Sequence, residues 1–365
     1  MMFLSPRQPA PAHSADAAVR STDSDALLSR VSAANQGYLT DPFAALFLAP
    51  AQRRSPERRP PLINIGTHAR TWALDELVDQ FLRSAEDSQP QVREQRTTVQ
   101  VLSLGAGADT RFWRMRKRWD ERRGAASWPC RRWVEVDFPE ATGAKARTVS
   151  SKAELREALG GEIKIEQGGL GLTSSLYAVL PGDLRDLATL ASSLLSPPRS
   201  PSTAPPLLDP SLPTLLLLEC VLVYLSPSAT DGILSWFANT FKDGSSVSYD
   251  PFGLHDSFGQ VMKRNLATRG LTLPGADSTP TLDSLTQRLR SNGFEGPAHT
   301  LSIKQIRSEG FIPAAELERV NKIEQIDEVE ELNLVLDHYA VTWGTVGAPP
   351  EEERPRIALA VHARP

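Results

Sequence analysis

Cysteine is scarce in this chain: only Cys130 and Cys220 occur among its 365 residues. Two cysteines cannot build a disulfide framework or a zinc site. Cys220 falls inside an apolar run, where we expect it to be a small core residue of a strand. The scarcity favours a reducing, intracellular compartment, and we expect the protein to be cytoplasmic.

Long hydrophobic segments and an excess of positive charge are also missing. The longest apolar run, residues 215–225, is interrupted by Glu219 and is far too short to span a membrane. The net charge is −4, and the arginine clusters at residues 53–54, 58–59 and 114–118 have acids nearby, which is typical of solvated faces. We therefore expect a soluble protein that binds neither membranes nor nucleic acids.

Proline is abundant instead, and many of the 29 prolines fall in two stretches, residues 50–61 and 196–213. We expect both stretches to be irregular surface insertions. Residues 1–22 lack the apolar segment of a signal peptide and are predicted to form a disordered tail. The remainder, residues 23–365, is long enough for one large domain that carries the two insertions.

Strand and helix patterns alternate along this remainder, which predicts an α/β fold with a doubly wound, mostly parallel sheet. Strands are expected at residues 99–104, 132–136, 177–180, 214–218 and 247–249. Two late strands, residues 340–343 and 357–361, lack a long helix between them and predict an antiparallel hairpin at one sheet edge. Helices are expected at residues 25–36, 71–85, 109–119, from 139, at 184–195, 229–241, 255–268, 282–292 and 329–338, the first two being N-terminal additions.

A glycine-rich turn, Gly105-Ala106-Gly107, follows the first of these strands, and the second strand ends in Asp137. Glycines let the backbone approach a ligand, and the N-terminus of the following helix offers free N–H groups. An acid at the tip of the next strand can accept both hydroxyls of a ribose. The pattern therefore predicts a nucleoside-binding site.

The missing third glycine narrows the choice of nucleoside. A dinucleotide-binding turn has a third glycine that allows close packing around a pyrophosphate, but Thr110 takes that place here. The chain also lacks the G-x-x-x-x-G-K-[ST] motif that binds nucleoside triphosphates. A ligand without phosphate fits better, so we expect the cofactor S-adenosylmethionine (SAM) and a Rossmann-like methyltransferase sheet rather than a dehydrogenase.

Two further acids lie where ligands bind in such sheets, beyond the carboxyl ends of strands. Asp183 contacts a ligand or caps the following helix, and its spacing does not decide between the two. Glu219 follows four leucines, and a buried carboxylate there needs a partner. That partner is a ligand or a cation, with a purely structural ion pair as the alternative.

Six segments, in this order, resemble the leucine carboxyl methyltransferase family: INIGTHART (63–71), LGAGADTRFWR (104–114), VEVDFP (134–139), DLRDL (183–187), LPTL (212–215) and ECVLVYL (219–225). Each motif is weak alone, but six in order are specific. The resemblance spans residues 25–344 and implies a class I SAM-dependent methyltransferase. The family methylates the C-terminal leucine of the protein phosphatase 2A catalytic subunit, which is the partner implied here.

The resemblance also implies which residues contact the cofactor. Arg70 would bind the methionyl carboxylate, Asp137 would bind the ribose, and Glu219 would bind the methionyl amino group. Asp183 and Leu184 would hold the adenine edge. The full set of implied contacts is Arg30, Arg70, Gly105, Asp137, Asp183, Leu184 and Glu219.

Two departures from the family pattern put local contacts in doubt. Ile65 stands where the family usually has arginine, and His68 where it usually has an aromatic residue. The resemblance therefore implies no acceptor or cofactor contact at either position.

An α-carboxyl group has a reference pKa of about 3.3 to 3.7, so the acceptor needs no general base at pH 7. We expect catalysis by positioning, with Arg70 and Tyr224 orienting the acceptor carboxylate; a half-buried structural aromatic is the alternative for Tyr224. No metal site and no Ser/His/Asp or Cys/His arrangement is expected, and the protein is expected to be a monomer. The rival functions are a small-molecule or tRNA-related carboxyl or O-methyltransferase of the same fold and a SAM-binding phosphatase assembly factor without turnover.

Overall fold

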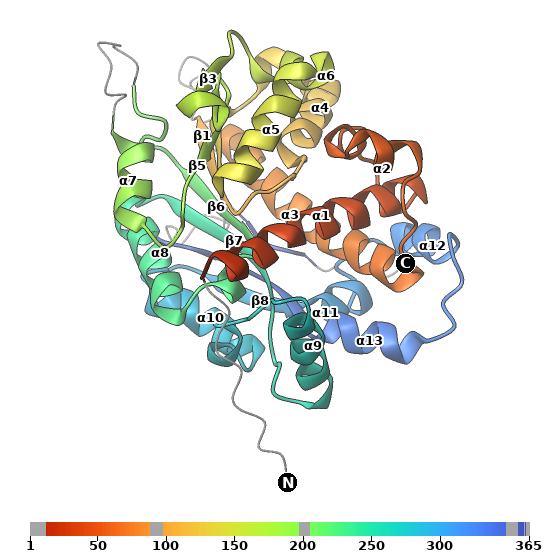
Figure 1. Cartoon of the computed structure of the whole chain (residues 1–365). Helices are drawn as coiled ribbons and strands as arrows, with labels where there is room; N and C mark the ends of the chain where they lie inside the picture. Colours follow the sequence, from red (N-terminus) through yellow and green to blue (C-terminus); the bar gives the residue numbers. More distant parts are fainter. Residues whose placement is uncertain (1–11, 88–97, 197–204, 348–356, 361, 363–365) are drawn as a thin grey trace.

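The computed structural model describes residues 12–87, 98–196, 205–347, 357–360 and 362. Nine strands form one sheet in the order β3-β4-β5-β2-β1-β6-β7-β9-β8. Helices cover both of its faces (Figure 1). The strands are β1 (Val99–Leu104), β2 (Cys130–Asp137), β3 (Lys164–Glu166), β4 (Gly171–Thr173), β5 (Tyr177–Pro181), β6 (Thr214–Glu219), β7 (Gly244–Pro251), β8 (Ala298–Ser302) and β9 (Tyr339–Thr345).

The centre of the sheet is parallel, as predicted. Strand β1 pairs in parallel with β2 on one side and β6 on the other, and β5 and β7 continue the parallel pairing outward. The chain therefore reverses its direction of winding at β1. In such sheets ligands bind outside the carboxyl ends of the strands at this reversal point, here Leu104, Asp137 and Glu219.

Both edges of the sheet are antiparallel. The prediction that residues 340–343 pair with residues 357–361 in a hairpin is wrong. Strand β9 matches the first predicted strand but lies between β7 and β8. Residues 357–360 form neither helix nor strand, and residue 361 lies outside the described residues. Their apolar side chains, Ile357 and Leu359, are buried in the core, so they satisfy the apolar pattern without joining the sheet.

Two hydrophobic layers hold helices to the sheet. One layer joins the sheet to α3, α4, α5, α11 and α13, and the other joins it to α7, α8 and α10. Figure 1 shows α1 running beside α3 across the sheet. The helices are α1 (Ala12–Asn35), α2 (Pro50–Arg54), α3 (Pro61–Asp87), α4 (Arg111–Arg123), α5 (Pro139–Ser151), α6 (Ala153–Arg156), α7 (Leu187–Leu195), α8 (Pro227–Thr240), α9 (Ser257–Thr268), α10 (Leu282–Ser291), α11 (Ile303–Ser308), α12 (Ala314–Asn321) and α13 (Val329–Asp337). No helix among the described residues is long and apolar enough to cross a membrane.

The N-terminal region is more helical than predicted. Helix α1 begins at Ala12, where a disordered tail to residue 22 was expected; residues 1–11 lie outside the described residues. Helix α2 and the start of α3 also fall within the proline-rich stretch expected to be irregular. Proline tolerates the first helical position because its missing N–H would have no partner there. In the second proline-rich stretch, the described residues 205–213 contain no helix or strand, and residues 197–204 lie outside the described residues.

A buried polar cluster supports the glycine-rich turn from behind. The Tyr177 hydroxyl donates to Glu135 Oε2 at 2.7 Å, and Lys145 forms an ion pair with the same carboxylate. Lys145 also donates to the backbone oxygen of Asp109 at 2.8 Å. Burial raises the pKa of Glu135, opposed by Lys145, so this carboxylate depends on both of its partners.

The Tyr177→Phe variant should therefore be less stable than the wild type. It leaves a buried carboxylate short of one donor, which costs about 1.5 to 3 kcal/mol for a hydrogen bond to a charged group. Urea unfolding followed by circular dichroism measures the loss. An unchanged midpoint would show that the hydroxyl makes no net contribution to stability.

Candidate cofactor site

A cavity of about 530 Å³ lies at the carboxyl ends of β1, β2 and β6 and is bordered by α1 and α3. Small-molecule sites typically measure about 300 to 1,000 Å³. The structure places every candidate site residue from the sequence on the wall of this cavity: Arg30, Arg70, Gly105, Asp137, Asp183, Leu184, Glu219 and Tyr224. Among the described residues, no group of three or more His, Cys, Asp or Glu side chains could hold a metal ion.

The glycine-rich turn and Asp137 form one end of the cavity. Gly105 and Gly107 have φ angles of +66° and +44°, which glycine adopts without strain. Gly107 N donates to Asp137 Oδ2 at 2.6 Å, and Phe138 N donates to Oδ1 at 2.6 Å. Each carboxylate oxygen has a second lone pair, so Asp137 can still accept hydroxyl groups. Burial raises the pKa of Asp137, and the two backbone donors oppose that rise.

Asp23 of α1 is a second acid at this end that sequence reasoning missed. Its Oδ1 accepts a hydrogen bond from Ala108 N at 2.7 Å, and its carboxylate lies where a side chain at position 107 would point. Burial raises the pKa of Asp23. No local pattern could have revealed this contact, because 85 residues separate the two partners.

Arg70, Glu219 and a pair of tyrosines form the other polar end. Arg70 Nε lies 3.0 Å from Glu219 Oε1, and the guanidinium sits 5.3 Å from the centre of the Tyr249 ring. Tyr249 in turn stacks on Tyr339, with ring centres 5.3 Å apart. Burial would lower the pKa of Arg70, but Glu219 raises it above its ordinary value, so this cation stays charged inside the cavity wall.

Glu219 has the cationic partner that the sequence argument required, and it also faces the cavity. Its Oε2 accepts from Arg111 Nη2 at 2.9 Å while Oε1 pairs with Arg70. Glu219 therefore forms ion pairs within the protein and can still contact a ligand in the cavity. The carboxylate remains 21% exposed, so it can also accept a cationic ligand group.

Cys220 was expected to be a core residue inside a strand, and this prediction is wrong. It lies just beyond β6, where it is half-buried and lines the cavity. Its φ is +55°, a conformation that is uncommon for a residue with a side chain. The chain must turn here because the strand ends at Glu219. Strained positions of this kind cluster at functional sites.

Arg30 supplies a buried donor that is not satisfied by the described part of the chain. Its Nε donates to Asp41 Oδ2 at 2.5 Å and its Nη1 to Thr71 Oγ1 at 3.2 Å, but Nη2 has no hydrogen-bond partner there. Arg30 is only 6% exposed and lines the cavity. Buried donors are normally paired, so an orphaned guanidinium nitrogen at a cavity indicates an anionic ligand group such as a carboxylate.

Asp183 and Leu184 lie at the rim of the cavity, beyond β5. The Asp183 carboxylate accepts from Arg185 Nε at 2.8 Å, and this donor lowers its pKa. Asp186, rather than Asp183, caps α7, because its side chain accepts from Thr189 N. The helix-cap alternative for Asp183 is therefore wrong, while an adenine contact stays a prediction.

Neither departure from the family pattern lies on the cavity. Ile65 is 1% exposed in the hydrophobic core. His68 is buried, and its Nε2 lies 2.8 Å from Glu316 Oε1. Neither side chain is among the residues that line the cavity.

The chain was compared with known families and proteins. The model of a family described as leucine carboxyl methyltransferase matches residues 18–238. A protein named leucine carboxyl methyltransferase 1 from Cryptococcus neoformans is 43% identical over 94% of this chain and 98% of its own length. The Bos taurus protein of that name is 33% identical over 92% of both chains.

Solved structures resemble the chain more weakly. Human N-acetylserotonin methyltransferase in complex with SAM matches 79% of this chain and 56% of its own chain, at 12% identity and a TM-score of 0.35, which is too low to carry an argument. The family model and the sequence relatives carry the family assignment instead. The chain belongs to the leucine carboxyl methyltransferase family, and its cofactor is SAM.

Proposed function

We propose that the protein transfers a methyl group from SAM to the α-carboxylate of a C-terminal leucine and that this leucine ends the catalytic subunit of protein phosphatase 2A. The names of the relatives support a leucine carboxyl acceptor. The resemblance seen in the sequence supports the phosphatase subunit. One observation carries the proposal: Arg30 and Arg70 line the same cavity as a group of apolar side chains.

The residues divide the cavity into parts that match this chemistry. Asp137 and the backbone of Gly105 and Gly107 would hold the nucleoside, with Asp183 and Leu184 at the adenine edge. Arg30 and Arg70 would hold the methionyl carboxylate, and Glu219 the amino group. Ile63, Ile303, Val335 and Leu336 line the cavity from α3, α11 and α13 and would contact a leucine side chain.

The bound cofactor supplies an electrophilic methyl group on a positively charged sulfur. Arg70 and Tyr224 would orient the acceptor carboxylate toward that group. Because the carboxylate is already ionised at neutral pH, the protein needs to position it rather than deprotonate it. Such positioning can lower a barrier by about 7 to 11 kcal/mol in well-oriented systems.

The Gly107→Ala variant tests the nucleoside end. A methyl group at a φ of +44° is strained and collides with the Asp23 carboxylate, so the turn or the Asp23 side chain must shift. We expect SAM affinity, measured by calorimetry, to fall by about tenfold or more. Gly124→Ala is the matched control, because Gly124 has a φ of +83° with nothing within 4 Å of an added Cβ. Equal SAM affinity in both variants would contradict the proposed role of the turn.

Arg70→Lys tests the carboxylate-binding end. Lysine keeps the charge but loses the planar fork of donors, so the carboxylates would be misplaced. We expect kcat/KM to fall by about 100-fold, the size that a misplacement of about 1 Å can have. Arg83→Lys on the same helix is the control, because Arg83 pairs with Glu76 and Asp79 and does not line the cavity. A fully active Arg70→Lys enzyme would make Arg70 a structural cation.

Labelled SAM tests the acceptor directly. The intact phosphatase catalytic subunit should be labelled, whereas the same subunit with an amidated C-terminus should not be, because the nucleophile is the free carboxylate. Mild alkali should release the label as methanol, since the product is a methyl ester. Alkali-stable label, or equal labelling of the amidated subunit, would exclude C-terminal carboxyl methylation and favour another acceptor.

A further inference from the structure

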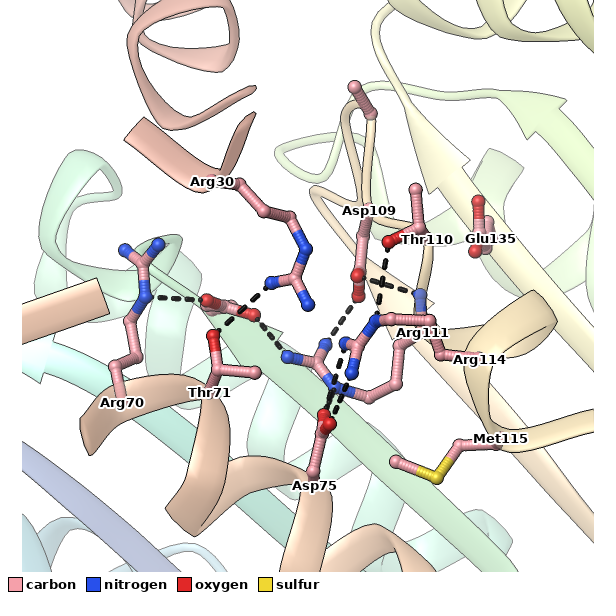
Figure 2. A network of polar contacts seen from close by, with 12 residues as sticks. Arg30, Arg70, Thr71, Asp75, Asp109, Thr110, Arg111, Arg114, Met115 and Glu135 are labelled. Atoms are coloured by element: carbon pink, nitrogen blue, oxygen red, sulfur yellow. Dashed lines mark hydrogen bonds and ion pairs between the residues drawn. The ribbon is translucent and has the colours of Figure 1, made fainter. Parts of the chain in front are cut away.

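Asp75 lies behind the cavity wall on α3, and three arginines of α4 converge on it. Arg111 Nε donates to Asp75 Oδ1 at 3.0 Å, and Arg114 binds both carboxylate oxygens, with Nη2 3.1 Å from Oδ1. Arg118 donates to Oδ2 at 2.9 Å from the solvent side. Figure 2 shows Arg111 and Arg114 meeting at Asp75 beneath Arg30 and Arg70.

From Arg111, the interactions continue to one wall of the cavity. Arg111 Nη2 donates to Glu219 Oε2 at 2.9 Å, and Glu219 Oε1 lies 3.0 Å from Arg70 Nε. Arg111 is fully buried and also pairs with Asp109. A continuous series of ion pairs therefore links Asp75 to Arg70 through Arg111 and Glu219.

From Arg114, the interactions continue to a second residue that lines the cavity, Arg30. Arg114 Nε lies 3.4 Å from Asp41 Oδ2, which accepts from Arg30 Nε at 2.5 Å. The Thr110 hydroxyl bridges this arm, because it donates to Asp41 Oδ2 at 2.5 Å and accepts from Arg114 Nε at 3.3 Å. The two arms meet at Asp75 and end in Arg70 and Arg30, two of the arginines that line the cavity.

The negative charge of Asp75 helps to balance the positive charges of Arg111 and Arg114. Burial would raise the pKa of Asp75, but Arg114 and Arg111 lower it well below its ordinary value, so it stays ionised. Without that charge, two buried arginines would lose a shared partner and would compete for the nearest remaining carboxylates. Those carboxylates are Asp41 for Arg114, and Asp109 and Glu219 for Arg111. Asp41 and Glu219 now orient Arg30 and Arg70.

We propose that Asp75 is a positioning residue for the amino-acid end of SAM: it fixes Arg30, Arg70 and Glu219 through Arg111 and Arg114. Asp75 does not line the cavity and therefore does not touch the cofactor. The inference rests on the proposed function in one respect, the assignment of Arg30, Arg70 and Glu219 to the methionyl group. It adds a residue that governs the shape of that end without contacting it.

Two ligands distinguish positioning from general loosening of the fold. S-adenosylhomocysteine carries the nucleoside and the amino acid, whereas 5′-methylthioadenosine carries the nucleoside alone. By calorimetry, Asp75→Asn should bind S-adenosylhomocysteine about tenfold more weakly and methylthioadenosine as the wild type does. Asp79→Asn is the matched control one turn along α3, because Asp79 pairs with Arg83 and Arg122 and does not line the cavity. It should bind both ligands normally.

Equal weakening of both ligands, or no weakening of either, would overturn the positioning role. A wild-type protein that binds S-adenosylhomocysteine no more tightly than methylthioadenosine would instead overturn the methionyl assignment of the proposed function. If Asp75→Asn does not fold, Thr110→Val tests the Arg114 arm without removing a charge. It should weaken S-adenosylhomocysteine selectively, and unchanged binding of both ligands by Thr110→Val would overturn the proposal.

Discussion

The arrangement of the site depends on the buried ion pairs of Arg111. This side chain is fully buried, and it joins Asp75 on α3, Asp109 in the glycine-rich turn and Glu219 at the end of β6. Burying such charges is costly, and removing one member of a buried pair leaves an uncompensated charge, which costs about 3 to 5 kcal/mol. The three segments therefore hold one relative position, and that position defines both ends of the cavity.

The acids paired with arginines and the two acids that face the nucleoside have opposite net pKa shifts. Asp41, Asp75 and Asp109 lie among arginines that lower their pKa values against the effect of burial, so their stabilising contribution is present at neutral pH and is lost only as the pH falls through those lowered values. Burial raises the pKa of Asp23 and Asp137 at the nucleoside end. Their ionised forms cost stability at neutral pH, and hydroxyl donors from a bound nucleoside would relieve that cost. The stability contributed by the acids that pair with arginines thus offsets the cost of burying Asp23 and Asp137, and that cost favours binding of a nucleoside.

Features encoded within one short segment could be predicted from the sequence. The glycine-rich turn, Asp137 and Glu219 follow strands whose apolar patterns are clear, and a parallel sheet brings their carboxyl ends together. Arg30, Leu184 and the adenine role of Asp183 came from the family resemblance alone. Asp23 and Asp75 escaped detection because their partners lie 85 and 36 or more residues away, and a charged residue in a helix is usually solvated. The edge strands β3 and β4 have three residues each, too few to show an alternating pattern.

The turn after β6 shows how local strain and long-range pairing combine. Cys220 adopts a φ of +55°, and its N–H donates to Tyr249 O at 2.7 Å, which ties the turn to the neighbouring strand. Glycine would adopt this φ without strain, but it would also enlarge the range of conformations open to the unfolded chain. The strained residue therefore persists because Glu219, immediately before it, is fixed by Arg70 and Arg111. The same turn carries Tyr224 to the cavity wall, so the pairing that orients the cofactor end also determines where the acceptor can be held.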